Sequence, residues 1–287
     1  MNLLSGLEKY GLGQTGDLDI LNDGSDKKKK TAGAGATEEV ELSEKDFILD
    51  RKVVCPICDK EFLVKTVKSS KVKRLEPDAD LRPNHEYVDT VKYGVAACPR
   101  CGYAAMHRDF AHLSATQRKW IRETITANFK PTEEPKMDVY TYDYAVEKYK
   151  LALVNTIAKK GKLSEKAYIC LNLAWLRRAQ MENTPDDTPM NAKKKKQYQA
   201  EYEGFYRQAY DGFMKVVVTE TPPFHGMDAN TIDYILANMA VKYQEYDTAS
   251  KLVSRLLTQP GTPKRMKDKC LELKEEIIVA LRNNKQE

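Results

Sequence analysis

Two cysteine pairs, each with two residues between its members, constrain the fold of this chain more than any other feature of its sequence. The pairs are Cys55-Pro-Ile-Cys58 and Cys98-Pro-Arg-Cys101. Each pair places two thiolates at a tight turn, where backbone N–H groups can donate hydrogen bonds to sulfur. Two such turns, which we call the first and second knuckles, form a tetrahedral four-sulfur site when β-strands bring them together. The sequence therefore predicts one metal ion bound by Cys55, Cys58, Cys98 and Cys101.

The predicted metal site is structural, with zinc as the expected ion and iron as the alternative. When the protein supplies all four ligands, no coordination position remains open for water or a substrate. Rubredoxin-type iron sites use the same four thiolates, so the ligand set alone does not distinguish the two metals. Those proteins usually have glycine directly after the first knuckle, where this chain has Asp59. This difference favours zinc, and metal binding is expected to drive folding of the module.

Short runs of alternating apolar residues flank both knuckles and predict β-strands. Phe62, Val64 and Thr66 alternate after the first knuckle, and the residues at 91–97 alternate before the second. Between these runs, the stretch LEPDADLRPNHE is rich in Pro, Asp and Asn and predicts a loop. We therefore predict a zinc-ribbon domain at 46–110.

Helical periodicity begins after residue 110 and continues almost to the end of the chain. A connecting helix and linker are expected at 111–137, because Ser114 and Gln117 have the spacing of a capping box. Six helical segments follow within a domain predicted at 138–287. They are 138–160, 163–182, 193–219, 228–244, 246–258 and 263–283. The last is expected to be a capping helix with one buried stripe, which comprises Met266, Cys270, Leu273, Ile277 and Leu281.

The predicted helices repeat a spacing of small and large residues that is typical of tetratricopeptide repeats. The small positions include Ala145, Ala209 and Ala249, which would let the two helices of a hairpin approach closely. The copies are irregularly spaced, so the array is degenerate and an ordinary helical bundle is the alternative. The predicted fold class is α+β and mostly α: a small β zinc ribbon followed by a tetratricopeptide-like array of helical hairpins.

The first 45 residues are predicted to be a disordered leader with a short amphipathic tip. Glycines, small residues and the lysines at 27–30 bury too little apolar surface to offset the entropy of ordering. At the tip, Leu3, Leu4 and Leu7 follow helical spacing, which predicts a turn that orders only against another surface. No apolar run approaches the ~20 residues of a membrane span, and no secretory signal opens the chain. A cytoplasmic protein with no membrane partner is therefore expected.

No catalytic arrangement stands out in the sequence, which has no phosphate-binding glycine loop, no Ser/His/Asp set and no carboxylate pair. The sequence therefore favours a non-enzymatic adaptor for a protein partner, with no small-molecule substrate evident. Arrays of helical hairpins form concave grooves, and aromatic and arginine side chains often anchor interfaces. The groove residues expected on this basis are Trp175, Arg177, Arg178, Tyr206 and Tyr210, with core packing as the alternative for Trp175.

A basic stretch in the predicted ribbon supports an alternative function. On an extended strand, Lys65, Lys71 and Lys73 would share one face, which could contact nucleic-acid phosphates. The net charge of +5 is too small to indicate a nucleic-acid binder by itself. A nucleic-acid-associated regulator is thus the second hypothesis, and a rubredoxin-like iron electron carrier is the third.

Several stretches resemble one uncharacterised bacterial family, which is catalogued as domain of unknown function 2225. They are KDFILDRKVVCPICDKEFLVKTVKSSK, the DADLRP loop, YGVAACPRCGYAA and the helix around LNLAWLRRA. The resemblance extends from about 43 to 260, and the four cysteines match those of the family. It implies a zinc ribbon followed by tetratricopeptide-like helices. The family has no assigned activity, so the resemblance implies nothing about mechanism.

Overall fold

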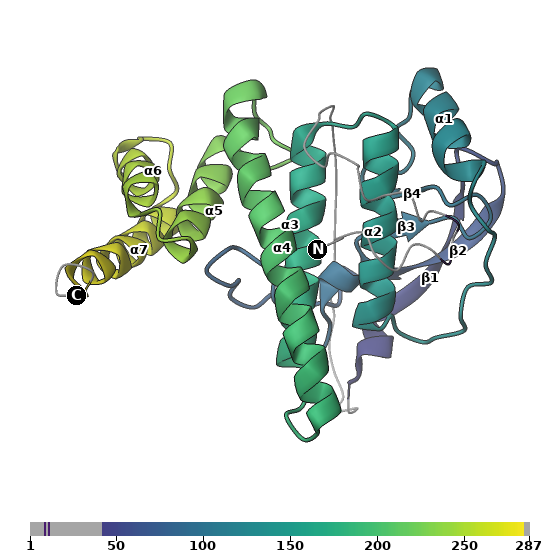
Figure 1. Ribbon diagram of the computed structural model, residues 1–287, viewed down its shortest axis with the longest axis horizontal. Helices are drawn as coiled ribbons and strands as arrows, with labels where there is room; N and C mark the ends of the chain where they lie inside the picture. Colours follow the sequence, from purple (N-terminus) through teal and green to yellow (C-terminus); the bar gives the residue numbers. More distant parts are fainter. Residues whose placement is uncertain (1–8, 10, 12–41, 284–287) are drawn as a thin grey trace.

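Two β-hairpins followed by seven helices make up the described part of the chain, which comprises residues 9, 11 and 42–283 of a computed structural model (Figure 1). The strands are β1 (Ile48–Val54), β2 (Glu61–Val67), β3 (Val95–Ala97) and β4 (Ala104–Met106). The helices are α1 (Ala115–Ile121), α2 (Tyr142–Ala158), α3 (Leu163–Glu182), α4 (Pro189–Thr219), α5 (Ala229–Lys242), α6 (Tyr246–Thr258) and α7 (Lys264–Asn283). The predicted α+β, mostly α class is confirmed.

Each β-hairpin carries one knuckle at its turn. β1 pairs antiparallel with β2, and β3 with β4, as two separate two-stranded sheets. The pair nearest the turn is Val54 with Glu61 in the first hairpin and Ala97 with Ala104 in the second. Both pairs enclose six residues that begin with a cysteine. The two knuckles therefore start from the same strand geometry.

The prediction of a strand at 91–97 is wrong for the first half of that range. Residues Thr90–Tyr93 form a short 3-10 turn, η3, and only Val95–Ala97 form a strand. The Asp89 side chain accepts a hydrogen bond from the Val91 backbone N–H, which stabilises the start of the turn. The apolar alternation in this stretch reflects burial within a turn.

All six helices predicted after residue 138 are present, and side-chain caps explain where several of them begin. The two largest differences are at helix starts: α2 begins at Tyr142 and not at 138, and α4 begins at Pro189 and not at 193. Thr188 accepts a hydrogen bond from the Asn191 N–H, and proline suits the first helical position. Ser114 begins α1 with the predicted capping box, and a π-helical turn, η4 (Arg122–Thr126), continues it.

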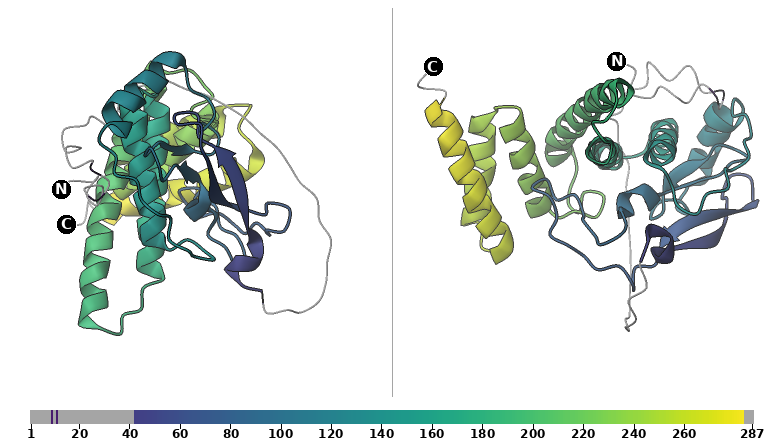
Figure 2. Two further views of the ribbon diagram at one scale, coloured as in Figure 1. Left: turned by 90° about the vertical axis from the view of Figure 1, so that its right-hand side faces the viewer. Right: turned by 90° about the horizontal axis from the view of Figure 1, so that it is seen from below.

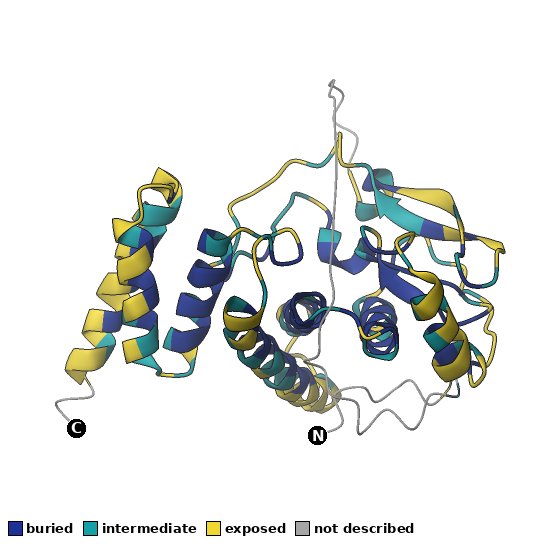
Figure 3. Cartoon of the chain, turned by 90° about the horizontal axis from the view of Figure 1, so that it is seen from above, coloured by how far each residue is buried: buried dark blue, intermediate teal, exposed yellow. Residues whose placement is uncertain are grey.

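The helices pack in chain order onto the β-hairpins. α2 lies against β3 and β4, α3 packs on α2, and α4 packs on α3 (Figure 1). α5, α6 and α7 follow at the end opposite the hairpins (Figure 2). Figure 3 shows that α2 and α3 are buried on most sides, whereas α6 and α7 keep exposed outer faces. The small residues Ala145, Ala209 and Ala249 are fully buried in the core. The likeness to tetratricopeptide repeats remains a prediction.

One hydrophobic core joins the hairpins to the helices. It extends from Cys55 at the first knuckle, through Tyr103, to Ile277 on α7. The segments predicted as a ribbon and as a helical domain therefore share buried residues. On α7, the predicted buried stripe ends early, because Leu281 is 38% exposed. The predicted leader lies outside the described residues except for Lys9, Gly11 and 42–45.

Candidate metal centre

The two knuckles have the same backbone hydrogen bonds. In the first, the Cys55 N–H donates to the Lys60 carbonyl at 3.0 Å, and the Asp59 N–H donates to the Cys55 carbonyl at 2.9 Å. In the second, the corresponding bonds join Cys98 with Tyr103 at 2.8 Å and Gly102 with Cys98 at 3.1 Å. The fifth residue of each turn has a positive φ, 57° at Asp59 and 73° at Gly102. Aspartate is one of the few residues besides glycine that tolerate this conformation.

The hairpins bring the four predicted cysteines together. Their sulfur atoms all lie within 4.8 Å of one another. Cys55 Sγ is 3.5 Å from Cys101 Sγ, and Cys58 Sγ is 3.7 Å from Cys98 Sγ. Four sulfurs bonded to one tetrahedral ion at ≈ 2.3 Å would be separated by about 3.8 Å. The four side chains therefore fit a single zinc or iron ion with shifts of at most about 1 Å in their sulfur separations.

Hydrogen bonds within the cluster prepare it for a cation. The pKa of Cys98 is held far below its usual range, because the thiols of Cys101 and Cys55 donate hydrogen bonds to its sulfur and backbone N–H groups add to them. The pKa of Cys101 is raised instead, since its hydrogen bonds to Cys55 and Cys98 and its burial favour the neutral thiol. Cys55, Cys98 and Cys101 thus share protons that a bound metal ion would replace.

Backbone N–H groups of each knuckle also reach the sulfur of its first cysteine. They belong to Ile57 and Cys58 for the Cys55 sulfur, and to Arg100 and Cys101 for the Cys98 sulfur. Donors in this arrangement favour the thiolate over the thiol. The N–H donors predicted at the knuckles are confirmed.

Side chains from the helical part hold both knuckles in place. Arg122 donates from Nη2 to the Ile57 carbonyl at 3.0 Å and from Nε at 3.3 Å. Thr126 Oγ1 donates to the Cys101 carbonyl at 3.1 Å, and Asn155 Nδ2 donates to the Gly102 carbonyl at 2.8 Å.. These three anchoring residues were not predicted from the sequence, because nothing in their local sequence marks them as neighbours of the cysteines.

Burial separates the centre from solvent on most sides. Cys55, Cys98 and Cys101 are at most 3% exposed, and Cys58 is half-buried. The second knuckle packs so closely on Phe129 that a Cβ at Gly102 would lie 2.3 Å from its ring. Four protein sulfurs in this surrounding leave no open coordination position, which is the arrangement of a structural metal site.

The five residues predicted to line a partner groove serve internal contacts. Trp175, Arg177, Tyr206 and Tyr210 are at most 5% exposed, so the expectation that they line an open groove is wrong. Arg177 pairs with Glu201 at 3.0 Å, and Tyr210 donates to Glu245 at 2.6 Å. Burial of these side chains leaves them no surface for a partner.

The remaining predicted groove residue, Arg178, holds a long loop of the ribbon. The loop comprises residues 75–84, which we call the 75–84 loop, and an isolated bridge between Arg74 and His85 closes its base. Within it, buried Asp80 accepts hydrogen bonds from Trp175 at 2.9 Å and from Arg178 at 2.8 Å. The predicted loop therefore crosses to α3 and covers the face on which a groove was expected.

The three lysines of the alternative nucleic-acid surface do not form one strand face. β2 ends at Val67, so Lys71 and Lys73 lie beyond the strand and its alternation does not extend to them. Lys65 pairs with Asp50 at 2.9 Å, and Lys73 pairs with Glu86. The prediction that the three lysines share one strand face is therefore wrong. Acidic neighbours also compensate the charges of Lys65 and Lys73.

Comparisons with known proteins identify the family of the chain. No curated protein and no solved structure matches this chain. In the described part of the chain, no helix has both the length and the apolar composition that a bilayer crossing requires. The family model described as "Uncharacterized protein conserved in bacteria (DUF2225)" matches residues 48–277. This range includes both knuckles, the whole of α1 to α6 and most of α7. The chain therefore belongs to this uncharacterised bacterial family.

Proposed function

We propose that this protein is a non-enzymatic cytoplasmic adaptor in which a structural zinc ion stabilises the hairpins and the helical part binds a protein partner. The observation that carries the proposal is the closed set of four sulfurs, three of them almost fully buried. Such a centre supplies folding energy and offers no position for a substrate. A reducing compartment suits these thiolates, because it keeps them available to the metal.

Zinc is the proposed ion because closed four-cysteine sites on ribbon hairpins are typical structural zinc sites. When bound, zinc supplies four metal–sulfur bonds that fix one hairpin against the other. Asp59 does not by itself distinguish zinc from iron, since it adopts the same left-handed conformation as Gly102. Elemental analysis and an absorption spectrum of the purified protein test this part. One equivalent of zinc and no colour supports it, whereas iron with a visible spectrum supports the electron-carrier alternative, and absence of metal refutes both.

A cleft between the 75–84 loop and the C-terminal helices supports the proposed partner site. Its volume is about 540 Å³. Apolar groups on both sides contribute to its walls, and they include Leu75, Pro77, Leu81 and Met266. Leu75 is 42% exposed, so part of its side chain is free to contact an apolar segment in the cleft. The cleft is therefore suited to an apolar segment of another protein.

Charges at the same cleft indicate what such a segment would carry. Arg74, Arg265 and Lys269 line it, and Glu76 is the acidic residue among the lining side chains. Glu76 accepts from Arg265 and lies 2.9 Å from Lys269 Nζ, which shows how a carboxylate is held there. The cations outnumber the carboxylate, so we expect the partner to present acidic side chains next to apolar ones.

Site-specific crosslinking tests the adaptor proposal. A photoreactive amino acid at Leu75 is expected to crosslink a partner in cells, whereas the same group at Val218, which is 83% exposed on α4, is not. With that partner purified, Arg265→Glu combined with Lys269→Glu is expected to weaken binding at least tenfold. Lys274→Glu, an exposed position on the same helix, is the matched control and should change affinity less than twofold. Equal affinity for the double variant and the control would refute the cleft as the partner site.

A further inference from the structure

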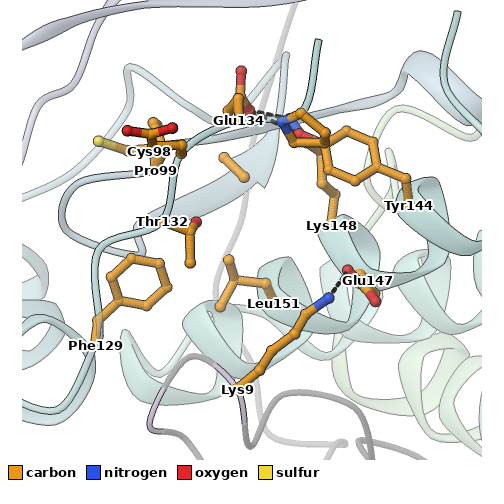
Figure 4. Close-up of a pocket in the computed structure, with 13 residues that line it drawn as sticks. Lys9, Cys98, Pro99, Phe129, Thr132, Glu134, Tyr144, Glu147, Lys148 and Leu151 are labelled. Atoms are coloured by element: carbon orange, nitrogen blue, oxygen red, sulfur yellow. Dashed lines mark hydrogen bonds and ion pairs between the residues drawn. The ribbon is translucent and has the colours of Figure 1, made fainter. Parts of the chain in front are cut away.

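A second pocket lies between the second knuckle, the linker before α2 and α2 itself (Figure 4). Its volume is about 340 Å³. The apolar lining residues are Ala97, Pro99, Phe129, Pro135 and Leu151. Cys98 also lines the pocket, so its wall is part of the metal centre. The interior is suited to apolar side chains.

Charged side chains at the rim of this pocket differ in how they are used. Lys148 donates to Glu134 at 2.7 Å and lies over the rings of Tyr140 and Tyr144, at 4.8 and 4.7 Å from their centroids. Its charge is therefore compensated by its own neighbours. Glu147, the preceding residue on α2, points toward the other side of the rim (Figure 4).

Lys9 and Gly11 of the leader contact this same face of the molecule. Lys9 Nζ lies 2.6 Å from Glu147 Oε2 at the rim of the pocket (Figure 4). Gly11 has a φ of 82°, and a Cβ there would lie 2.0 Å from the carbonyl oxygen of Asn128. No side chain fits at this position, and the backbone conformation is one that glycine adopts readily. The leader therefore meets the folded part of the chain at a specific place.

We propose that residues 3–9 of the leader are the ligand of this pocket in the same chain. Leu3, Leu4 and Leu7 occupy its apolar interior, and Lys9 pairs with Glu147 at the rim. Leu7 is two residues from Lys9, so the two Cα atoms are at most about 7 Å apart. Leu7 follows Leu4 by three residues and Leu3 by four, which is the spacing that would place it beside both on one helical turn.

Attachment to the same chain explains how so short a segment binds. An isolated turn of this length is unstable in water and orders only against a surface that buries its apolar side. The covalent tether raises the effective concentration of the leader at the pocket, so a weak intrinsic affinity is sufficient. Because the pocket wall includes Cys98 and Pro99, the bound leader covers the outer side of the second knuckle.

Hydrogen exchange measured by mass spectrometry on the full-length, metal-loaded protein tests the proposal. Residues 3–11 are expected to exchange at least tenfold more slowly in the wild type than in Leu7→Asp, which places a charge in the apolar interior. Leu18→Asp makes the same change in the leader away from the tip and is the matched control. It should leave exchange at 3–11 unchanged, and equal unfolding temperatures will show that all three proteins are folded.

The ion pair offers a second, independent measurement. Lys9→Glu is expected to accelerate exchange at 3–11 severalfold, and adding Glu147→Lys in the same chain is expected to restore much of the protection. A labelled peptide of residues 1–13 should bind full-length Leu7→Asp saturably, and a peptide with the same Leu7→Asp change should bind at least tenfold more weakly. Unprotected wild-type leader, equal protection in Leu7→Asp, or no saturable peptide binding would overturn the proposal. A dimer in light scattering that Leu7→Asp abolishes would overturn same-chain binding.

Discussion

The first and second knuckles share one backbone geometry but lie in different surroundings. The first is near solvent. Its fifth residue, Asp59, is exposed, and Arg122, which donates to the Ile57 carbonyl, is an exposed residue too. The second is part of the core, because Gly102 packs on Phe129 and its carbonyl is held by fully buried Asn155. The difference teaches that the same backbone hydrogen bonds define both turns, whereas the surrounding packing determines which residue the fifth position tolerates.

Metal removal is the strongest test of this comparison. A chelator is expected to destabilise the protein by several kcal/mol, because metal–thiolate bonding in structural zinc sites contributes about 10–16 kcal/mol in isolated peptides. Thermal unfolding with and without chelator measures the total effect. Hydrogen exchange should then rise more in β1 and β2 than in β3 and β4, since α2 packs on the second hairpin. Equal loss of protection in both hairpins would contradict the difference between them.

Alanine substitution at the fifth position of each knuckle should separate the two surroundings. Gly102→Ala is expected to cost about 2–5 kcal/mol, because it combines left-handed backbone strain with overpacking against Phe129. Asp59→Ala is expected to cost less than about 1 kcal/mol, since Asp59 already carries a Cβ in the left-handed conformation and the change adds no clash. Denaturant unfolding of the metal-loaded proteins gives both values. Similar costs at the two positions would show that the packing is not decisive.

Removal of one anchoring side chain from each knuckle should give a smaller contrast. Asn155→Ala is expected to cost about 1–3 kcal/mol, because it leaves the buried Gly102 carbonyl without its hydrogen bond. Arg122→Ala is expected to cost less than about 1 kcal/mol, since Arg122 is itself exposed and its removal lets water replace it at the Ile57 carbonyl. Unfolding free energies at constant metal content provide the measurement. A larger effect at Arg122 would reverse the assignment of surface and core knuckles.

Asp59→Gly makes the first knuckle resemble the second and should have the smallest effect. Glycine relieves the left-handed strain but increases the entropy of the unfolded chain, so the net change is expected to be within about 1 kcal/mol. Competition with a chromogenic chelator should give an unchanged metal affinity. A tenfold loss of affinity would assign the Asp59 side chain a role that its exposed position does not indicate.

Sequence patterns predicted the metal centre and the helices because both depend on local information. The spacing of Cys55 and Cys58 places two sulfurs on one turn whatever the rest of the chain does, and helical periodicity is likewise local. The contacts of Asp80 with Trp175 and Arg178 could not be predicted, since they join residues almost a hundred positions apart. For the same reason, burial of the expected groove residues was missed: aromatic and arginine side chains are common both at interfaces and in such buried networks.

The contacts that join the 75–84 loop to α3 also set an order for assembly during protein synthesis. Arg178 is made about 75 residues after Cys101. At a translation rate of roughly 5–20 residues per second, all four cysteines exist for about 4–15 s before the loop can reach its partners on α3. The metal centre can therefore close on the nascent chain first, and the 75–84 loop is attached only when α3 has been made.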